Sequence, residues 1–272
     1  MDKTTIQIGF LGMGNMAQAI ATGLIEKAGI RGPQLKAYAP HQDKLRNNAE
    51  RIGFTPCSSA GDAVSGSDFV IIACKPYQIE GLLDELGDAL NGKAVLSIAL
   101  GWNLERYRSV LEDRARIQFV MPNTPAQVGE GVFLFEAEST FRDEEKALWK
   151  QLFATMGLVE ELPARLMGVG GALTGCGPAF VDLMIEAYAD AAVSYGIPRD
   201  KAYQLTSQMI LGSAKLQLVS KKTPGELKDA VCSPGGSTIR GVMALEKNGY
   251  RAACISAIVA AVDGDKKPER RK

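Results

Sequence analysis

The chain lacks the features that mark several large classes of protein. Its 31 Lys and Arg are matched by 31 Asp and Glu, so it has no basic excess of the kind that binds nucleic acid. No run reaches about 18 uninterrupted apolar residues, and the first apolar run, 6–16, is broken by three glycines, unlike a membrane span or a signal peptide. We therefore expect a cytoplasmic protein without nucleic-acid or membrane partners.

Histidine and cysteine are too few and too scattered to build a metal site. His41 is the only imidazole, and the five cysteines form no C-x-x-C pair. Scattered thiols of this kind are typical of a reduced, intracellular protein. The sequence therefore predicts free cysteines and no bound metal.

Two patterns divide the chain near residue 165. Before it, short β-branched runs alternate with amphipathic helical stretches, which indicates βαβ units and a mainly parallel sheet. After it, the pattern is helical almost throughout. The expected strands are 6–11, 34–38, 68–74, 93–99, 117–121, 132–135 and 158–162, and the expected helices are 16–28, 44–52, 79–86, 143–156, 167–195, 199–220, 237–248 and 250–262.

The helices of the second part need partners for their apolar faces. Segments 188–192 and 257–261 are rich in alanine, and such small side chains let helices approach one another closely. We therefore expect this part to form a homodimer. The mostly charged residues 263–272 are expected to form a solvated, disordered tail.

A glycine-rich turn follows the first expected strand directly and begins the first expected helix. In this context Gly12 permits a tight turn, Gly14 lets a pyrophosphate approach the backbone, and Ala17 lets the helix pack closely on the sheet. Free N–H groups at the helix start can bind the phosphates. The sequence therefore predicts an α/β fold, with a Rossmann-type dinucleotide-binding domain at 1–165 followed by an all-α domain at 166–272. The candidate cofactor-binding residues of the turn are Gly12, Met13, Gly14, Asn15, Met16 and Ala17.

The end of the second expected strand indicates which dinucleotide binds. Enzymes that prefer NAD usually place an acid there for the ribose 2′-hydroxyl, whereas 30–42 contains no Asp or Glu. Donors near a 2′-phosphate would attract it instead. We expect NADP(H) to be preferred, with NAD(H) as the alternative. The candidate residues are Ala39, Pro40 and His41, with Lys44 and Arg46 close behind.

Two further loops follow expected strands and should border the ligand crevice. The first contains Ala73, Cys74, Lys75 and Pro76, and Lys75 can hydrogen-bond a ribose or a phosphate. In the second, a proline on each side of 123–124 would hold Asn123 rigidly at the rim of the crevice. We predict that both loops bind the cofactor.

The available acids and bases favour a C=N substrate over an alcohol. His41 belongs by position to the adenosine end of the cofactor, so a histidine acid or base is excluded. Hydroxyacid dehydrogenases with a helical second domain generally use a lysine on its first long helix, and 151–200 contains none. Hydride addition to an iminium instead requires positioning, a carboxylate clamp and a hydroxyl near the nitrogen.

Segment 231–240 has the composition of an anion site at a helix entry. Ser233 or Ser237 can cap the helix, Pro234 suits its first turn, and Gly235 and Gly236 expose N–H groups. A small carboxylate fits such a segment.

These motifs together resemble the pyrroline-5-carboxylate reductase family over nearly the whole chain. The resemblance rests on 12–17, 73–76, 121–125, 174–180 and 233–239, and the last two are specific in combination. It implies a Rossmann domain with an interleaved helical dimerisation domain. It further implies that NAD(P)H reduces 1-pyrroline-5-carboxylate, a cyclic imino acid, to L-proline in the last step of proline biosynthesis. Homodimers of this family often assemble into decamers.

The same resemblance implies roles for single residues. Thr238 is similar to the threonine whose hydroxyl contacts the ring nitrogen and is the candidate catalytic residue. The backbone of Ser233, Gly235, Gly236 and Ser237, together with Thr238, is similar to the substrate clamp. The chain departs from the family pattern at secondary contacts, with Cys176 for Ser, Cys232 for Ser or Thr, and Ala230 where some members have Asn.

Three other functions stay open. A 3-hydroxyacid or sugar-acid dehydrogenase would share the coarse architecture. A reductase of another cyclic imino acid, such as the six-membered one, would keep every motif. A non-catalytic nucleotide-sensing module would need the turn at Gly12 but not the hydroxyls at 233–238. Ring size, oligomer order above the dimer and regulation by proline are not specified by these motifs.

Overall fold

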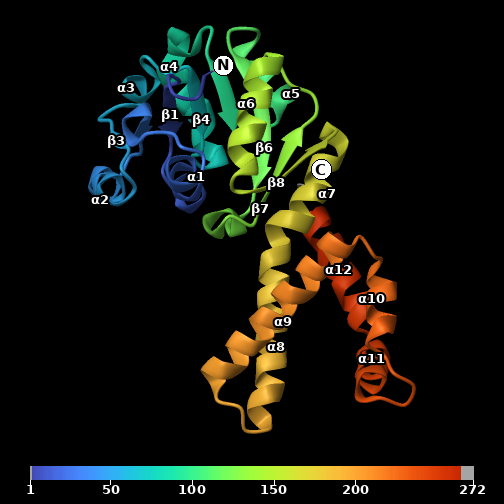
Figure 1. The fold of residues 1–272 in the computed structure, drawn as a ribbon. Helices are drawn as coiled ribbons and strands as arrows, with labels where there is room; N and C mark the ends of the chain where they lie inside the picture. Colours follow the sequence, from blue (N-terminus) through green and yellow to red (C-terminus); the bar gives the residue numbers. More distant parts are fainter. Residues whose placement is uncertain (1, 265–272) are drawn as a thin grey trace, which may run out of the picture. The chain divides into compact units, whose positions relative to one another are not determined.

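The computed structural model describes residues 2–264, which divide between Gly175 and Cys176 into two compact units. The N-terminal unit contains an eight-stranded sheet with helices on its faces, and the C-terminal unit is helical (Figure 1). The predicted α/β class with a helical second part is confirmed. Of the expected tail, residues 265–272 lie outside the described residues, and residues 263 and 264 end the last helix.

The strand order places a topological switch point beside the first strand. The order is β3-β2-β1-β4-β5-β6-β7-β8, and every neighbouring pair is parallel except β6 and β7. Because the chain moves from β1 to β2 on one side and to β4 on the other, a crevice is expected outside the carboxyl ends of β1 and β4. The strands are β1 (Ile8–Leu11), β2 (Leu35–Tyr38), β3 (Thr55–Pro56), β4 (Phe69–Ile72), β5 (Ala94–Ser97), β6 (Arg116–Pro122), β7 (Gly131–Glu136) and β8 (Gly157–Leu162).

Helices cover the sheet in two layers, each with its own apolar core. One core contains side chains of α1, α2 and α6, and the other contains side chains of α3, α4 and α5. Strands β1, β4 and β5 are buried at every residue, as expected for parallel strands covered on both faces. The helices are α1 (Asn15–Glu26), α2 (Gln42–Ile52), α3 (Ala60–Val64), α4 (Ile79–Leu86), α5 (Leu104–Leu111), α6 (Asp143–Ala154) and α7 (Ala164–Gly171).

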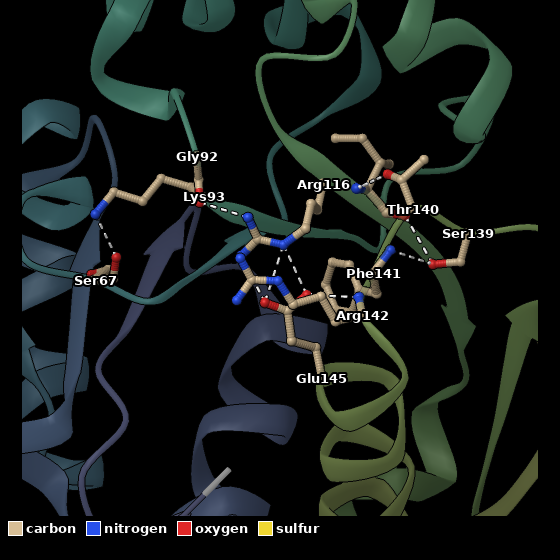
Figure 2. A network of polar contacts seen from close by, with 10 residues as sticks. Ser67, Gly92, Lys93, Arg116, Ser139, Thr140, Phe141, Arg142 and Glu145 are labelled. Atoms are coloured by element: carbon tan, nitrogen blue, oxygen red, sulfur yellow. Dashed lines mark hydrogen bonds and ion pairs between the residues drawn. The ribbon is translucent and has the colours of Figure 1, made fainter.

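An ion-pair network joins α6 to the amino-terminal ends of the strands, at the edge opposite the crevice (Figure 2). The Arg116 guanidinium donates to Glu145 through Nε at 2.9 Å and Nη2 at 2.7 Å, and to Gly92 O through Nη1 at 2.8 Å. The Arg142 N–H donates to the same carboxylate at 2.9 Å. Burial acts to raise the pKa of Glu145, but these hydrogen bonds outweigh it and hold that pKa below its ordinary value.

The C-terminal unit has almost no buried side chains of its own. Among its described residues only Ala189, Ala202 and Thr206 are buried, although α8 and α9 pack side by side. A π-helical turn, Ala172–Cys176, interrupts the single helix expected at 167–195. The helices are α8 (Gly177–Ser194), α9 (Arg199–Ser220), α10 (Pro224–Ala230), α11 (Ser237–Lys247) and α12 (Tyr250–Gly264).

One helical stretch among the described residues, Ala164–Ser194, is long and apolar enough by length and composition to cross a membrane. Within this stretch, the 18-residue segment that meets the criteria is only 6% buried in this chain. Length and composition are weak grounds for a membrane span, because core helices of soluble proteins meet the same criteria. The stretch therefore presents a largely exposed apolar helix surface.

Candidate active site

Three of the predicted segments meet at the carboxyl ends of β1, β2 and β4. The Gly12 N–H donates to Tyr38 O at 2.8 Å, and the Ala73 N–H donates to Leu11 O at 2.9 Å. These bonds bring 12–17, 39–41 and 73–76 to one edge of the sheet. That edge is the switch point, where ligands bind in open α/β sheets.

Gly12 occupies a position that only glycine can fill. Its φ is +102°, and a Cβ at this position would lie 2.7 Å from Ala73 C and from Cys74 N. A side chain would therefore collide with the backbone of the neighbouring loop and strain its own. The close approach of these two loops explains why the turn needs this glycine.

Gly14 and the first turn of α1 form a cradle that fits a pyrophosphate. Gly14 is the N-cap of α1 and makes no side-chain cap, so the N–H groups of Asn15, Met16 and Ala17 have no intrahelical acceptor. A Cβ at Gly14 would meet no atom within 4 Å. Ala17 is buried on the sheet as predicted, whereas the Met13 side chain, at 7% exposure, packs in the core. Met13 can therefore contribute only its backbone.

The segment after β2 presents no carboxylate until α2 begins. Pro40 and His41 are exposed, and His41 is the N-cap of α2 without a side-chain cap. Gln42 holds the segment in place, because its Nε2 donates to Ala39 O at 3.0 Å and to Cys57 O at 3.3 Å. Of the two cations named from the sequence, Arg46 is paired with Asp43 at 2.6 Å.

The 73–76 loop is held by an indole that the sequence analysis missed. Trp102, fully buried after β5, donates its Nε1–H to Pro76 O at 3.1 Å. The Arg106 guanidinium lies 4.2 Å from the Trp102 ring centroid and pairs with Glu80 at 3.0 Å. Lys75 remains exposed beside this support. The sequence feature that could have indicated this support is a tryptophan shortly after the expected strand 93–99.

Asn123 is placed at the end of β6, but its side chain already has partners. Its Nδ2 donates to Thr174 O at 3.0 Å, its Oδ1 accepts from Val132 N at 2.8 Å, and the residue is 6% exposed. The amide therefore joins three backbone segments of the N-terminal unit.

The segment 233–238 forms a turn and then begins α11. The Gly236 N–H donates to Ser233 O at 3.0 Å, and Gly235 has a φ of +68°. The N-cap is Gly236, not Ser233 or Ser237 as expected, and Pro234 lies in the turn before the helix. The helix therefore starts without a side-chain cap, which leaves its first N–H groups open to an anion. Thr238 is exposed, and no described residue hydrogen-bonds its hydroxyl.

The electrostatics around these residues do not supply a side-chain nucleophile or base. Burial raises the pKa of the Cys74 thiol, which keeps it protonated at neutral pH. Burial also raises the pKa of Tyr107, whose hydroxyl donates to Ser97 Oγ at 3.0 Å. Across residues 2–264, no three His, Cys, Asp or Glu side chains come together as a metal site. The arrangement can bind anions and position a substrate.

Comparison with known proteins agrees with this arrangement. A family model described as pyrroline-5-carboxylate reductase dimerisation matches residues 164–267, and one described as NADP oxidoreductase coenzyme F420-dependent matches residues 7–101. The crystal structure of Plasmodium falciparum pyrroline carboxylate reductase with NADP bound is similar at a TM-score of 0.87 and 31% identity, covering 96% of this chain and 97% of that chain.

Two curated relatives are similar over nearly their entire length. The pyrroline-5-carboxylate reductase of Treponema pallidum (strain Nichols) is 38% identical over 261 residues, covering 94% of this chain and 99% of that protein. The pyrroline-5-carboxylate reductase of Escherichia coli (strain K12) is 36% identical over 262 residues, covering 96% and 97%. This chain belongs to the pyrroline-5-carboxylate reductase family.

Proposed function

We propose that the protein reduces the C=N bond of 1-pyrroline-5-carboxylate to give L-proline, with NADP(H) as the hydride donor. The observation that carries the proposal is the N-terminus of α11, which has an uncapped first turn and the free hydroxyl of Thr238. These two groups match the carboxylate and the ring nitrogen of a cyclic imino acid. Membership of the family and the NADP-bound relative support the same reaction.

The residues of the chain position the substrate and need not move a proton. Hydride for the C=N carbon comes from the reduced nicotinamide when it is bound. The first N–H groups of α11 bind the substrate carboxylate, since helix N-termini attract anions. The Thr238 hydroxyl orients the ring nitrogen. Because an iminium already carries its proton, hydride addition yields the amine directly, which agrees with the absence of a suitable histidine or lysine.

NADP(H) binds the N-terminal unit in this proposal, at the first turn of α1 and the segment after β2. The lack of a carboxylate at 39–42 supports NADP(H) over NAD(H). Lys75 contacts a ribose or a phosphate. Asn123 contacts the cofactor through its backbone in this proposal, because both ends of its side-chain amide already have hydrogen-bond partners.

The proposed assembly is a cytoplasmic homodimer formed through 166–272, with decamers as the higher order and no membrane or nucleic acid as partner. The apolar surface of the C-terminal helices supports self-association, as does the dimerisation model that matches them. In this division of roles, 1–165 binds the cofactor and 166–272 binds the substrate.

Steady-state kcat/KM for five- and six-membered cyclic imino acids, each with NADPH and NADH, tests the function. We expect the five-membered substrate with NADPH to give the highest value. A higher value for the six-membered ring would assign another imino acid. Oxidation of a 3-hydroxyacid without imine reduction would point to the dehydrogenase alternative, and NADPH binding without turnover to a sensing module.

A further inference from the structure

Two side chains, Arg51 on α2 and Gln18 on α1, form a chain of hydrogen bonds that ends at the Gly12–Gly14 turn. The Gln18 Nε2 donates to Met13 O at 3.0 Å, and the Gln18 Oε1 accepts from Arg51 Nη2 at 2.6 Å. The main-chain N–H of Gln18 donates to Gly14 O at 2.9 Å. Helices α1 and α2, which carry the two side chains, are in contact (Figure 1).

The two partners of Gln18 leave one orientation for its amide. A carbonyl oxygen only accepts hydrogen bonds and a guanidinium only donates them. The NH₂ end must therefore face Met13 O, and the oxygen must face Arg51. By binding the Gln18 oxygen, Arg51 keeps the Gln18 NH₂ group directed at Met13 O in the turn.

The held carbonyl determines where the next N–H points. A trans peptide is planar, so the C=O of Met13 and the N–H of Gly14 point in opposite directions. Because Gln18 holds the carbonyl on its own side, the Gly14 N–H points away from Gln18. A reversed peptide would present the negative end of the Met13 carbonyl to a bound phosphate and repel it.

We infer that Gln18, supported by Arg51, is a positioning residue for the pyrophosphate turn. It touches neither substrate nor cofactor and acts by fixing the peptide between Met13 and Gly14. The inference rests on the proposed use of a dinucleotide. It predicts an effect on NADPH and NADH alike, because both contain the same pyrophosphate, and little effect on kcat once cofactor is saturating.

Gln18→Glu is the sharpest variant, because a carboxylate keeps the partner for Arg51 and removes the donor to Met13 O. Fluorescence titration of the full chain, without imine, measures the Kd of each dinucleotide. We expect the Kd to rise about tenfold for both, ~1.4 kcal/mol, with kcat changed less than threefold. Gln18→Leu should weaken both in the same way, and Arg51→Ala should weaken both by a smaller factor.

Gln34→Glu is a matched control at the opposite edge of the sheet. The Gln34 Nε2 donates to Ile6 O at 2.8 Å, and its Oε1 accepts from Arg31 Nε at 3.2 Å, so it repeats the same chemistry away from the turn. We expect this variant to lower Tm and leave both Kd values unchanged.

Unchanged Kd values in Gln18→Glu, or a lower Tm as its only effect, would overturn the inference. Weaker binding of NADPH alone would also overturn it, since that result would place the effect at the 2′-phosphate. Failure of the unmodified protein to bind either dinucleotide would defeat the proposed function together with the inference.

Discussion

The two units of the chain bury their apolar side chains to very different extents. The N-terminal unit encloses large side chains such as Trp102, Trp149 and Phe133 without exposure to solvent. The C-terminal unit buries only two alanines and one threonine among its described residues, while α8, α9, α11 and α12 all expose large apolar side chains. The first unit has a large apolar core of its own, whereas most apolar side chains described in the second unit remain exposed.

This difference also separates the two halves of the proposed chemistry. The cradle for the cofactor is built by loops that bind one another within the N-terminal unit, through Gly12, Tyr38 and Ala73. The candidate clamp is a helix start on helices that have few buried contacts. Changes to one unit should therefore affect cofactor binding, and changes to the other should affect assembly and turnover.

Disrupting the apolar surface of α9 should have the largest effect on enzymatic activity. Leu205 and Met209 lie one turn apart and are 53% and 47% exposed. The double substitution Leu205→Asp with Met209→Asp places charges on a surface that a partner must bury, and burial of unpaired charge is costly. We expect a monomer by sedimentation velocity and a loss of imine reduction exceeding about a hundredfold, ~2.7 kcal/mol, with NADPH binding retained.

Gln208→Asp introduces one carboxylate, where the double variant introduces two, at an exposed position of α9 that is already polar. This control should keep the oligomer and its activity. A double variant that stays dimeric and active would show that the exposed α9 surface is not an interface.

Breaking the ion pair between Arg116 and Glu145 should destabilise only the N-terminal unit. Glu145→Gln leaves Arg116 without its carboxylate, and removing one member of a buried pair costs about 3 kcal/mol. Because the pKa of Glu145 is lowered in the folded protein, its stabilisation is present above the ordinary value of 4.5 and is lost as pH falls through the lower folded value. Urea unfolding should therefore show the variant and the unmodified protein converging in acid.

Glu136→Gln is the matched control for that variant. Glu136 is as buried as Glu145, at 2% exposure each, but burial raises its pKa above the ordinary value. The stabilisation of the folded protein by protonated Glu136 is present below pH 4.5 and is lost as pH rises through the higher folded pKa. A glutamine oxygen can still accept the Leu104 N–H, so we expect a change within about 1 kcal/mol at neutral pH. Equal losses in both variants would contradict the assignment.

Gly14→Val should disable the cofactor site without unfolding the unit that contains it. Gly14 has a φ of −75°, and a Cβ there meets no neighbouring atom, so the fold accepts a side chain. The same side chain would fill the proposed cradle for the pyrophosphate. We expect the Kd of NADPH to rise about a hundredfold, ~2.7 kcal/mol, with the dimer intact. Tight NADPH binding by this variant would contradict the assignment of this turn as the pyrophosphate site.

Thr238→Ala should affect turnover alone and by the smallest factor. In the proposed site the Thr238 hydroxyl orients the ring nitrogen, so its loss should lower kcat/KM at least tenfold, about 1.4 kcal/mol, with the Kd of NADPH unchanged. Thr238→Ser keeps the hydroxyl and should retain most of the activity. Full turnover in the alanine variant would remove Thr238 from the mechanism.

Elements with several agreeing local signals were predictable from the sequence. The prediction 199–220 coincides with α9, and 79–86 coincides with α4, because helical periodicity and breaking residues agree at both ends. Two short elements were not predicted: β3 has only two residues and α3 only five, which is too few for a hydrophobic period to be recognised. The composition of 231–240 favours a serine cap for α11, whereas the structure uses Gly236.

The sequence by itself determined the layout: alternating strands and helices, a glycine-rich turn after the first strand, and a helical second part whose apolar faces need partners. These depend on local spacing and composition, which act over a few residues. The tertiary structure alone decided which side chains support the sites. Trp102 reaches Pro76 across 26 positions, and Arg51 reaches Gln18 across 33. Such contacts exist only once parallel strands bring distant loops to one edge, so no local pattern encodes them.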